Sequence, residues 1–113
     1  MNRNNNACTN DDLVEMYAKF NKRYFHNKLP KDLVVRFHNL KRLGDDCGRT
    51  QFFWGRPAFI LINKRTCWSY MLTAPTLLHE MVHVEHPEWR GHGSRFHKRM
   101  LQLAKAGAFK PYW

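Results

Sequence analysis

Two histidines and a glutamate in the second half of the chain have the spacing of a metal site. His79, Glu80 and His83 form the pattern H-E-x-x-H. Four residues advance an α-helix by roughly 400°, so the two imidazoles project from one face, one turn apart. Both can then reach one Zn²⁺ ion at about 2.0–2.1 Å. Glu80 lies where its carboxylate can polarise a water molecule without binding the metal. We therefore predict that His79 and His83 bind zinc and that Glu80 is the catalytic base.

A catalytic zinc ion takes a third protein ligand and leaves its fourth position to water. The downstream candidates are two carboxylates and three histidines: Glu85, Glu88, His86, His92 and His97. His86 lies about 10.5 Å along the helix axis from His79, so three side chains strung over that length cannot converge on one ion. We place His86 at the helix C-terminus, where a partly protonated imidazole suits the dipole. His92 is preferred, because Gly91 and Gly93 let the backbone turn sharply toward the metal.

His97 is the second choice for the third ligand. It falls inside a predicted helix, next to the apolar stripe of that helix. The metzincin spacing would require a third histidine at position 89, which is Trp89. That subclass is therefore excluded.

The residues before the motif predict a helix and three strands. Thr9 to Asp12 resembles a capping box and introduces an amphipathic helix over Asp11–His26. The strand-like runs are Leu33–His38, Arg49–Trp54 and Ala58–Asn63. Gly55-Arg56-Pro57 joins the last two runs as a hairpin, and Gly44–Gly48 reads as a turn.

Two further helices carry the motif and the residues after it. The motif helix is expected to start at Thr73, with Pro75 in its first turn, and to stop close to His86 before Pro87. Ser94 is expected to cap a last helix that reaches about Ala106 and ends at Gly107, with Phe96, Met100 and Leu103 on its inner stripe. Residues 64–72 stay unassigned. The order predicts a small zincin-like α+β domain with a three-stranded, antiparallel-type sheet.

Length and composition predict one intracellular domain. At 113 residues and 43% hydrophobic content the chain is globular, with a disordered tail over residues 1–9 and one domain over residues 10–113. Cys8, Cys47 and Cys67 cannot form a complete disulfide set, which favours reduced thiols. No apolar run reaches the length of a membrane span or signal peptide. We expect a cytoplasmic monomer with no membrane association.

The net charge of +10 favours a polyanionic partner, most commonly nucleic acid, with an acidic membrane or protein surface as alternatives. From Trp89 to Trp113 there are six Lys or Arg residues and no acid. The last helix carries a polar stripe that we interpret as contacts to a phosphate backbone: Arg95, Lys98, Arg99 and Lys105. A merely solvated face is the alternative. Exposed aromatic residues such as Trp54, Trp89 or Trp113 are candidates for stacking on unpaired bases, with core packing as the alternative that we expect for most of them.

The string Leu77-Leu78-His79-Glu80-Met81-Val82-His83, followed by Gly91-His92-Gly93-Ser94-Arg95-Phe96, resembles the SprT-like metallopeptidase domain, which is also found in Spartan-type DNA–protein crosslink proteases. The resemblance covers about residues 10 to 107. It implies a zinc-dependent endopeptidase that acts on DNA-bound proteins, with ligands His79, His83 and His92 and base Glu80. A DNA-associated protein of this kind would be found in the nucleoid or nucleus.

Two departures from the family pattern stand out. The segment between His83 and His92 is shorter than in the Spartan-type proteases, so the loop beside the cleft is trimmed. Many members also carry a Cys-rich zinc ribbon, which this sequence lacks, so we expect a minimal form whose DNA affinity comes from the domain itself.

Two other functions are compatible with the same residues. In the first, a nucleic-acid-binding module with little or no peptidase activity holds a structural zinc, with His97 as a fourth ligand. In the second, the same zinc centre hydrolyses a substrate that is not a peptide. The residue that stabilises the oxyanion also stays open among His97, Arg95 and Tyr70.

Overall fold

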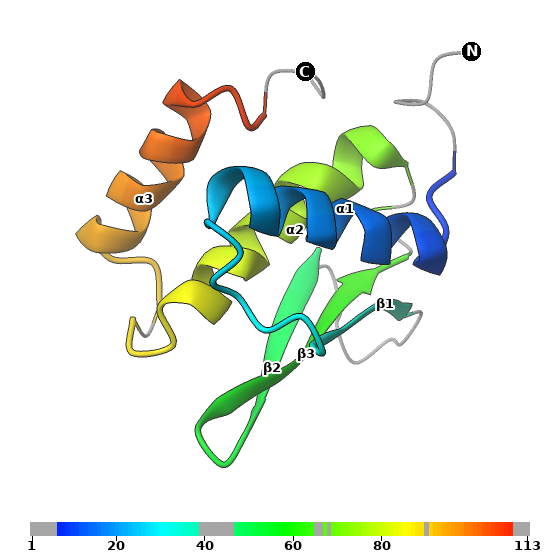
Figure 1. The fold of residues 1–113 in the computed structure, drawn as a ribbon, viewed down its shortest axis with the longest axis horizontal. Coiled ribbons are helices and arrows are strands. Elements are labelled where there is room, and N and C mark those ends of the chain that lie inside the picture. The colour runs from blue at the N-terminus through cyan, green and yellow to red at the C-terminus, as the bar shows by residue number, and fades with distance from the viewer. Residues whose placement is uncertain (1–6, 39–46, 65–66, 68, 90, 110–113) are drawn as a thin grey trace.

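The computed structural model describes residues 7–38, 47–64, 67, 69–89 and 91–109. Its helices and strands follow in the order α1 (Asn10–Tyr24), β1 (Val34–His38), β2 (Gly48–Phe53), β3 (Arg56–Asn63), α2 (Tyr70–Glu85) and α3 (Ser94–Lys105). α1 and α2 lie on the same side of the sheet, and α3 packs against α2 (Figure 1). The predicted α+β class is confirmed. Of the expected tail, residues 1–6 lie outside the described residues, whereas Ala7 forms a bridge with Ser69.

α1 begins with the predicted capping box. The Thr9 side chain accepts a hydrogen bond from the backbone of Asp12, whose carboxylate accepts one from the backbone of Thr9 in return. The helix ends at Tyr24, two residues before the predicted end. His26 and Asn27 have φ angles of 55° and 58°, in the left-handed region, so the helical conformation cannot continue through them.

The sheet is mixed, which corrects the predicted antiparallel type. Its strand order is β1-β3-β2. β2 and β3 form the predicted antiparallel hairpin, in which Phe53 pairs with Arg56. β1 instead runs parallel to β3, with Val35 opposite Ile60. A strand shows the same alternation of buried and exposed side chains whether it pairs in parallel or antiparallel. The sequence pattern that predicts a strand therefore carries no information on the direction of its neighbour.

α2 begins earlier than the sequence predicts. Its N-cap is Ser69, whose side chain accepts a hydrogen bond from the backbone of Leu72. Thr73, the expected cap, is buried inside the helix and donates its hydroxyl to the carbonyl of Cys67 at 3.1 Å. Pro75 consequently lies inside α2 rather than in its first turn. The helix ends at Glu85 with His86 as its C-cap, as predicted.

α3 spans Ser94–Lys105, and its N-cap is Gly93 rather than Ser94. Among the described residues no side chain caps this end, so the prediction that Ser94 does so is wrong. Phe96 and Leu103 are buried on the inner side, and Gly107 follows the helix with a φ of 86°. The predicted inner stripe therefore attaches α3 to the rest of the domain.

The core lies between the helices and one face of the sheet. Ile60 and Ile62 on β3 are fully buried, as are Leu77, Leu78 and Met81 on α2. Among the described residues, no helix has the length and hydrophobicity needed to cross a membrane. The motif histidines lie on the side of α2 that does not face this core. That side faces a cleft.

Candidate metal centre

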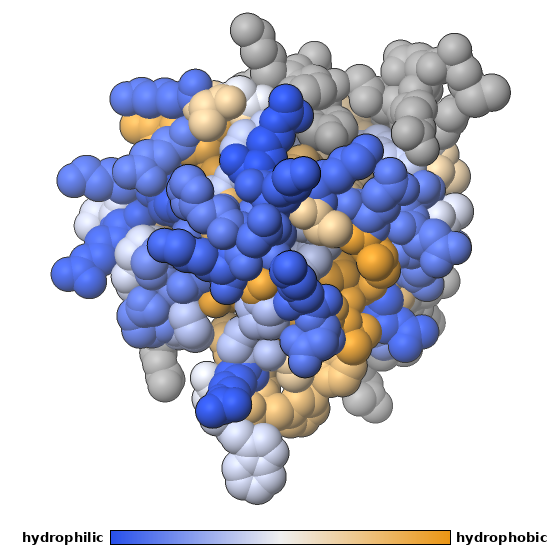
Figure 2. Space-filling model, viewed as in Figure 1, coloured by the Kyte–Doolittle hydropathy of each residue, from blue (hydrophilic) through white to orange (hydrophobic). Residues whose placement is uncertain are grey.

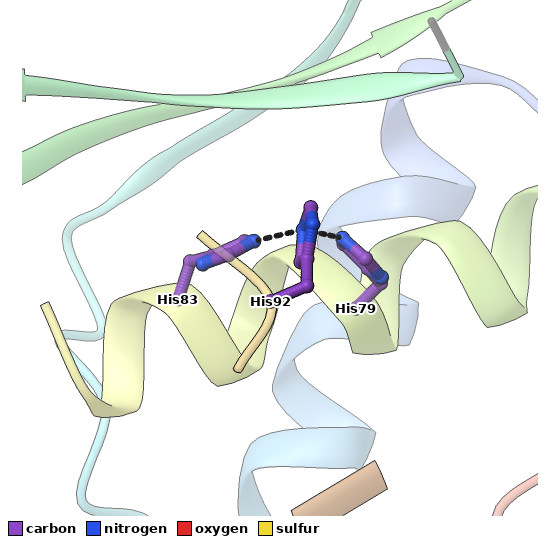
Figure 3. A group of neighbouring side chains, drawn as sticks. All are labelled: His79, His83 and His92. Carbon is purple, nitrogen blue, oxygen red and sulfur yellow. Dashed lines mark hydrogen bonds between the residues drawn. The ribbon is translucent and has the colours of Figure 1, made fainter. Parts of the chain in front are cut away.

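Three histidines meet beside α2. His79 and His83 project from successive turns of the helix, and His92 reaches them from the segment between α2 and α3 (Figure 3). The Nε2 atom of His92 lies 3.0 Å from that of His79 and 3.2 Å from that of His83. Gly91, with a φ of 76°, turns the backbone before His92. The possible ligand atoms of all three side chains lie within 4.8 Å of one another, so together they can hold a metal ion.

The ring of Phe96 packs against all three histidines of this triad and forms its floor, the apolar surface on which the imidazoles lie. Its centroid lies 4.8 Å from the ring centroids of His79, His83 and His92 alike. Phe96 is itself only 3% exposed. Sequence reasoning placed Phe96 on the inner stripe of the last helix, but its packing against all three imidazoles is visible only in three dimensions. One aromatic residue thus limits the rotamers of all three candidate ligands.

The surroundings favour the neutral form of His79 and His83. Burial, followed by the neighbouring His83 and His92, lowers the pKa of His79 to about 4. Burial and then His92 also lower the pKa of His83. A neutral imidazole offers a free lone pair, which a protonated one does not. Near neutral pH the site therefore presents nitrogen donors of the kind that suit zinc and other first-row transition metals.

Glu80 lies next to the triad without joining it. Its side chain is buried, and Oε2 is 4.0 Å from Nε2 of His79. The Thr50 hydroxyl on β2 lies 2.8 Å from Oε1 of Glu80 and can donate to it; it is 3.3 Å from the Glu80 carbonyl oxygen. The carboxylate is therefore held between the helix and the sheet, close to the place where a metal ion would sit.

Gly48 allows β2 to come this close to α2. A Cβ atom at Gly48 would lie 2.9 Å from Cγ2 of Thr76 and 3.3 Å from Cγ of Glu80, so any larger residue would push the strand away. From the sequence, Gly48 is predicted only as the end of a turn, and no local pattern points to Thr50. The signal that was available is a glycine next to a strand-like run, which often marks a close approach of another element.

The triad opens into a cleft of about 820 Å³. One wall is formed by Cys47 and by residues 48–50 and Phe52 of β2. Met100 and Ala104 of α3 contribute to the lining with Phe109. His79, Glu80 and His83 lie along the same cleft. A chain that entered it would pass the candidate metal ligands and the carboxylate together.

The family model of the SprT-like family matches residues 13–111. The chain belongs to the SprT-like family. Comparisons with curated proteins and with solved structures give no match. The match confirms the resemblance inferred from the two motif segments.

The other histidines considered as ligands lie outside the SprT-like triad. His86 stacks on Trp89 with ring centroids 3.7 Å apart, and its Nδ1 is 3.2 Å from Oε2 of Glu88. His97 is exposed, and its ring is nearly perpendicular to that of Phe96, with 6.4 Å between the two ring centroids. Within the described part of the chain, the group that can hold a metal contains three residues, which leaves coordination positions for water and substrate.

The candidates for oxyanion stabilisation are also elsewhere. His97, Arg95 and Tyr70 do not line the 820 Å³ cleft in the described part of the chain. Arg49 on β2 does line it. The sequence offered no reason to choose this residue, because its place across the cleft depends on how β2 packs against α2.

The basic residues of α3 divide into two groups. Arg95, Lys98 and Lys105 are exposed, as predicted. Arg99 instead bridges elements: its guanidinium donates to the Glu85 carboxylate, with Nε 2.7 Å from Oε1, and to the carbonyl of Tyr24 at 2.8 Å. Arg99 therefore holds α3 against the ends of α1 and α2, and we remove it from the set of expected phosphate contacts.

The ligand set can be tested with paired histidine variants. His92→Ala is expected to weaken zinc binding by more than the roughly 10–100-fold that loss of a residue supporting a ligand costs, because one of three donors is removed. His97→Ala is the control and is expected to leave the affinity unchanged. Competition with a chromophoric chelator measures both. An equal loss of affinity in the two variants would contradict the assignment of His92.

Proposed function

We propose that this SprT-like protein is a zinc-dependent endopeptidase that acts on DNA-bound proteins. The observation that supports the peptidase most directly is the buried Glu80 beside three converging imidazoles, along one continuous cleft. A structural zinc site would need neither an open coordination position nor a carboxylate kept out of the ligand set. The same arrangement therefore favours the enzyme over a nucleic-acid-binding module with a structural metal.

The residues of this chain have distinct tasks in peptide hydrolysis. When bound at the triad, a zinc ion would polarise the scissile carbonyl and acidify a water molecule. Glu80 takes the proton of the attacking water at its carboxylate and passes it to the leaving amine. The Thr50 hydroxyl, bonded to Oε1, orients the carboxylate so that Oε2 faces the triad. The cleft walls hold the peptide and restrict the access of bulk water.

Glu80→Gln tests the base. The amide keeps the size of the side chain and can still accept from Thr50, but it cannot take a proton. Cleavage of an unfolded protein substrate is expected to fall by about 10²–10⁴-fold, the usual contribution of a general base, while the zinc content stays unchanged. Glu15→Gln on the exposed side of α1 is the control. Full activity of zinc-loaded Glu80→Gln would remove Glu80 from its proposed role.

Thr50 should act through Glu80. Thr50→Val keeps the shape of the side chain but removes the donor to the carboxylate, and hydrogen bonds to charged groups typically contribute about 1.5–3 kcal/mol. We expect kcat to fall roughly 10-fold or more, by the same principle, with KM and zinc content unchanged. Thr50→Ser restores the hydroxyl and should recover most of the activity. If Val and Ser behave alike, the hydrogen bond has no catalytic importance.

A basic pocket next to α3 supports a nucleic-acid partner. The pocket has a volume of about 460 Å³ and is lined in part by Arg95 and Lys98, by His26 and by Trp89. Arg99 and Glu85 pair with each other at this pocket, so the charge that they carry is balanced locally. In Figure 2 hydrophilic side chains dominate the surface over α1 and α3. A phosphodiester backbone would find exposed cations here and a nearby ring on which a base can stack.

Salt titrations test this partner. Lys98→Ala should weaken DNA binding. It should also reduce the magnitude of the slope of log K against log salt concentration by about 0.9 for duplex DNA or about 0.7 for single strands, the amount expected for the loss of one phosphate contact. Lys31→Ala removes an exposed charge in the turn between α1 and β1 and serves as the control. Gel shifts or fluorescence anisotropy at several salt concentrations give the slopes. Absence of DNA binding at low ionic strength, or equal slopes for both variants, would refute a DNA partner at this pocket.

A further inference from the structure

A second hollow opens from the metal centre. It has a volume of about 400 Å³ and lies between the β2–β3 hairpin and the segment after α2, with the lining residues Phe52, Gly55, His83, Pro87, Trp89 and Gly91. We call it the hairpin groove. Phe52 and the candidate ligand His83 line both this groove and the main cleft. The hairpin groove is therefore a continuation of the cleft past the second histidine of the triad.

The described lining of the hairpin groove is apolar apart from His83. It contains no carboxylate, ammonium or guanidinium group. Gly55 and Gly91 have φ angles of 75° and 76°, and a Cβ atom at either position would meet nothing within 4 Å. Space is therefore open on both sides of the groove. A charged ligand group would lose hydration here without gaining a partner, whereas an apolar group would be favoured.

The two aromatic residues that line the groove, Trp89 and Phe52, differ in how firmly other residues fix their rings. The Trp89 ring stacks on His86 at an interplanar angle of 11°, and its backbone N–H donates to the His86 carbonyl at 3.0 Å. It is a fixed wall. Phe52 lies on the hairpin and is 41% exposed. A side chain of a bound ligand that covered Phe52 would bury apolar surface that is exposed to water in the free protein.

We propose that the hairpin groove is a substrate subsite, which binds a large apolar or aromatic side chain of the peptide close to the bond that is cleaved. This inference rests on the proposed peptidase function and specifies its substrate. The continuity with the cleft favours a peptide as the occupant, because a chain drawn past His83 must pass the groove. No cation is among the described residues that line it, which disfavours a phosphate-bearing strand. Phe52 and Trp89 then determine specificity.

Binding can be measured separately from cleavage in zinc-loaded Glu80→Gln. The probes are peptides of one parent sequence in which a single position carries Phe, Leu, Ser or Lys, and this position is moved along the peptide. Calorimetry or fluorescence anisotropy gives the affinities. At one position Phe and Leu peptides should bind about tenfold more tightly than the Ser peptide, since burial of such a side chain is typically worth at least that factor. Lys should bind no better than Ser.

Neighbouring phenylalanines supply a matched pair of variants. Phe52→Ser, in the Glu80→Gln background, should reduce the Phe-over-Ser preference to less than about twofold, by loss of the burial term. Its affinity for the Ser peptide should fall by less than its affinity for the Phe peptide, because Phe52 also lines the main cleft. Phe53 is more exposed than Phe52, packs edge-on against Phe59 at 5.8 Å and is not part of the groove lining, so Phe53→Ser should keep the preference. Phe52→Leu should keep most of it.

Three outcomes would overturn the subsite. They are absence of peptide binding, affinities that do not depend on the varied side chain, and a preference that Phe52→Ser and Phe53→Ser reduce equally. Cleavage of the same peptides by the zinc-loaded wild type is scored separately. If no peptide is cleaved while the preference and its loss in Phe52→Ser are observed, the peptidase proposal fails and the groove stands as a binding site. If cleavage occurs without any preference, only the subsite fails.

Discussion

The site depends on the contact between three imidazoles and the ring of Phe96. Each histidine ring lies the same 4.8 Å from that ring, although two come from α2 and one from the segment before α3. Burial is the main cause of the lowered pKa of His79, and Phe96 packs against that ring. The same contact fixes where α3 begins relative to α2. The position of the three candidate ligands and the neutral form of His79 thus both depend on the packing around these rings.

The opposite wall of the cleft is set by the approach of β2 to α2. The absence of a Cβ atom at Gly48 lets the strand come near enough for the Thr50 hydroxyl to reach the Glu80 carboxylate at 2.8 Å. Phe96 therefore positions the metal ligands from the side of α3, and β2 positions the carboxylate from the side of the sheet. α2 carries both sets of residues. The cleft is the space between α3, whose Phe96 packs on the histidines, and β2, whose Thr50 bonds to Glu80.

Local spacing was enough to predict the part of the site that lies on one helix. His79 and His83 are four residues apart, so any α-helix brings them together, and the two glycines beside His92 indicated a sharp turn. Contacts between distant segments gave no comparable signal. Thr50 is thirty residues from Glu80, and nothing in its own neighbourhood points to a carboxylate.

The errors of the sequence analysis have the same cause. Arg99 carries the spacing of an exposed stripe, yet Glu85 and the Tyr24 carbonyl draw it inward from two other helices. Thr73 has the chemistry of a cap, but its hydroxyl is used by the buried carbonyl of Cys67, and Ser69 caps the helix instead. Both residues have a local role that is plausible and a tertiary role that overrides it.

Trp89 connects the two surfaces to which the proposals assign ligands. It lines both the hairpin groove and the basic pocket of α3, and its ring stacks on His86. The described lining of the groove is apolar apart from His83, while the pocket carries Arg95 and Lys98. Under the two proposals, solvation and charge would direct an apolar peptide side chain and a polyanion to these separate surfaces. A protein attached to DNA presents both kinds of polymer within a short distance, and the proposed sites would give each of them a separate surface next to the candidate metal centre.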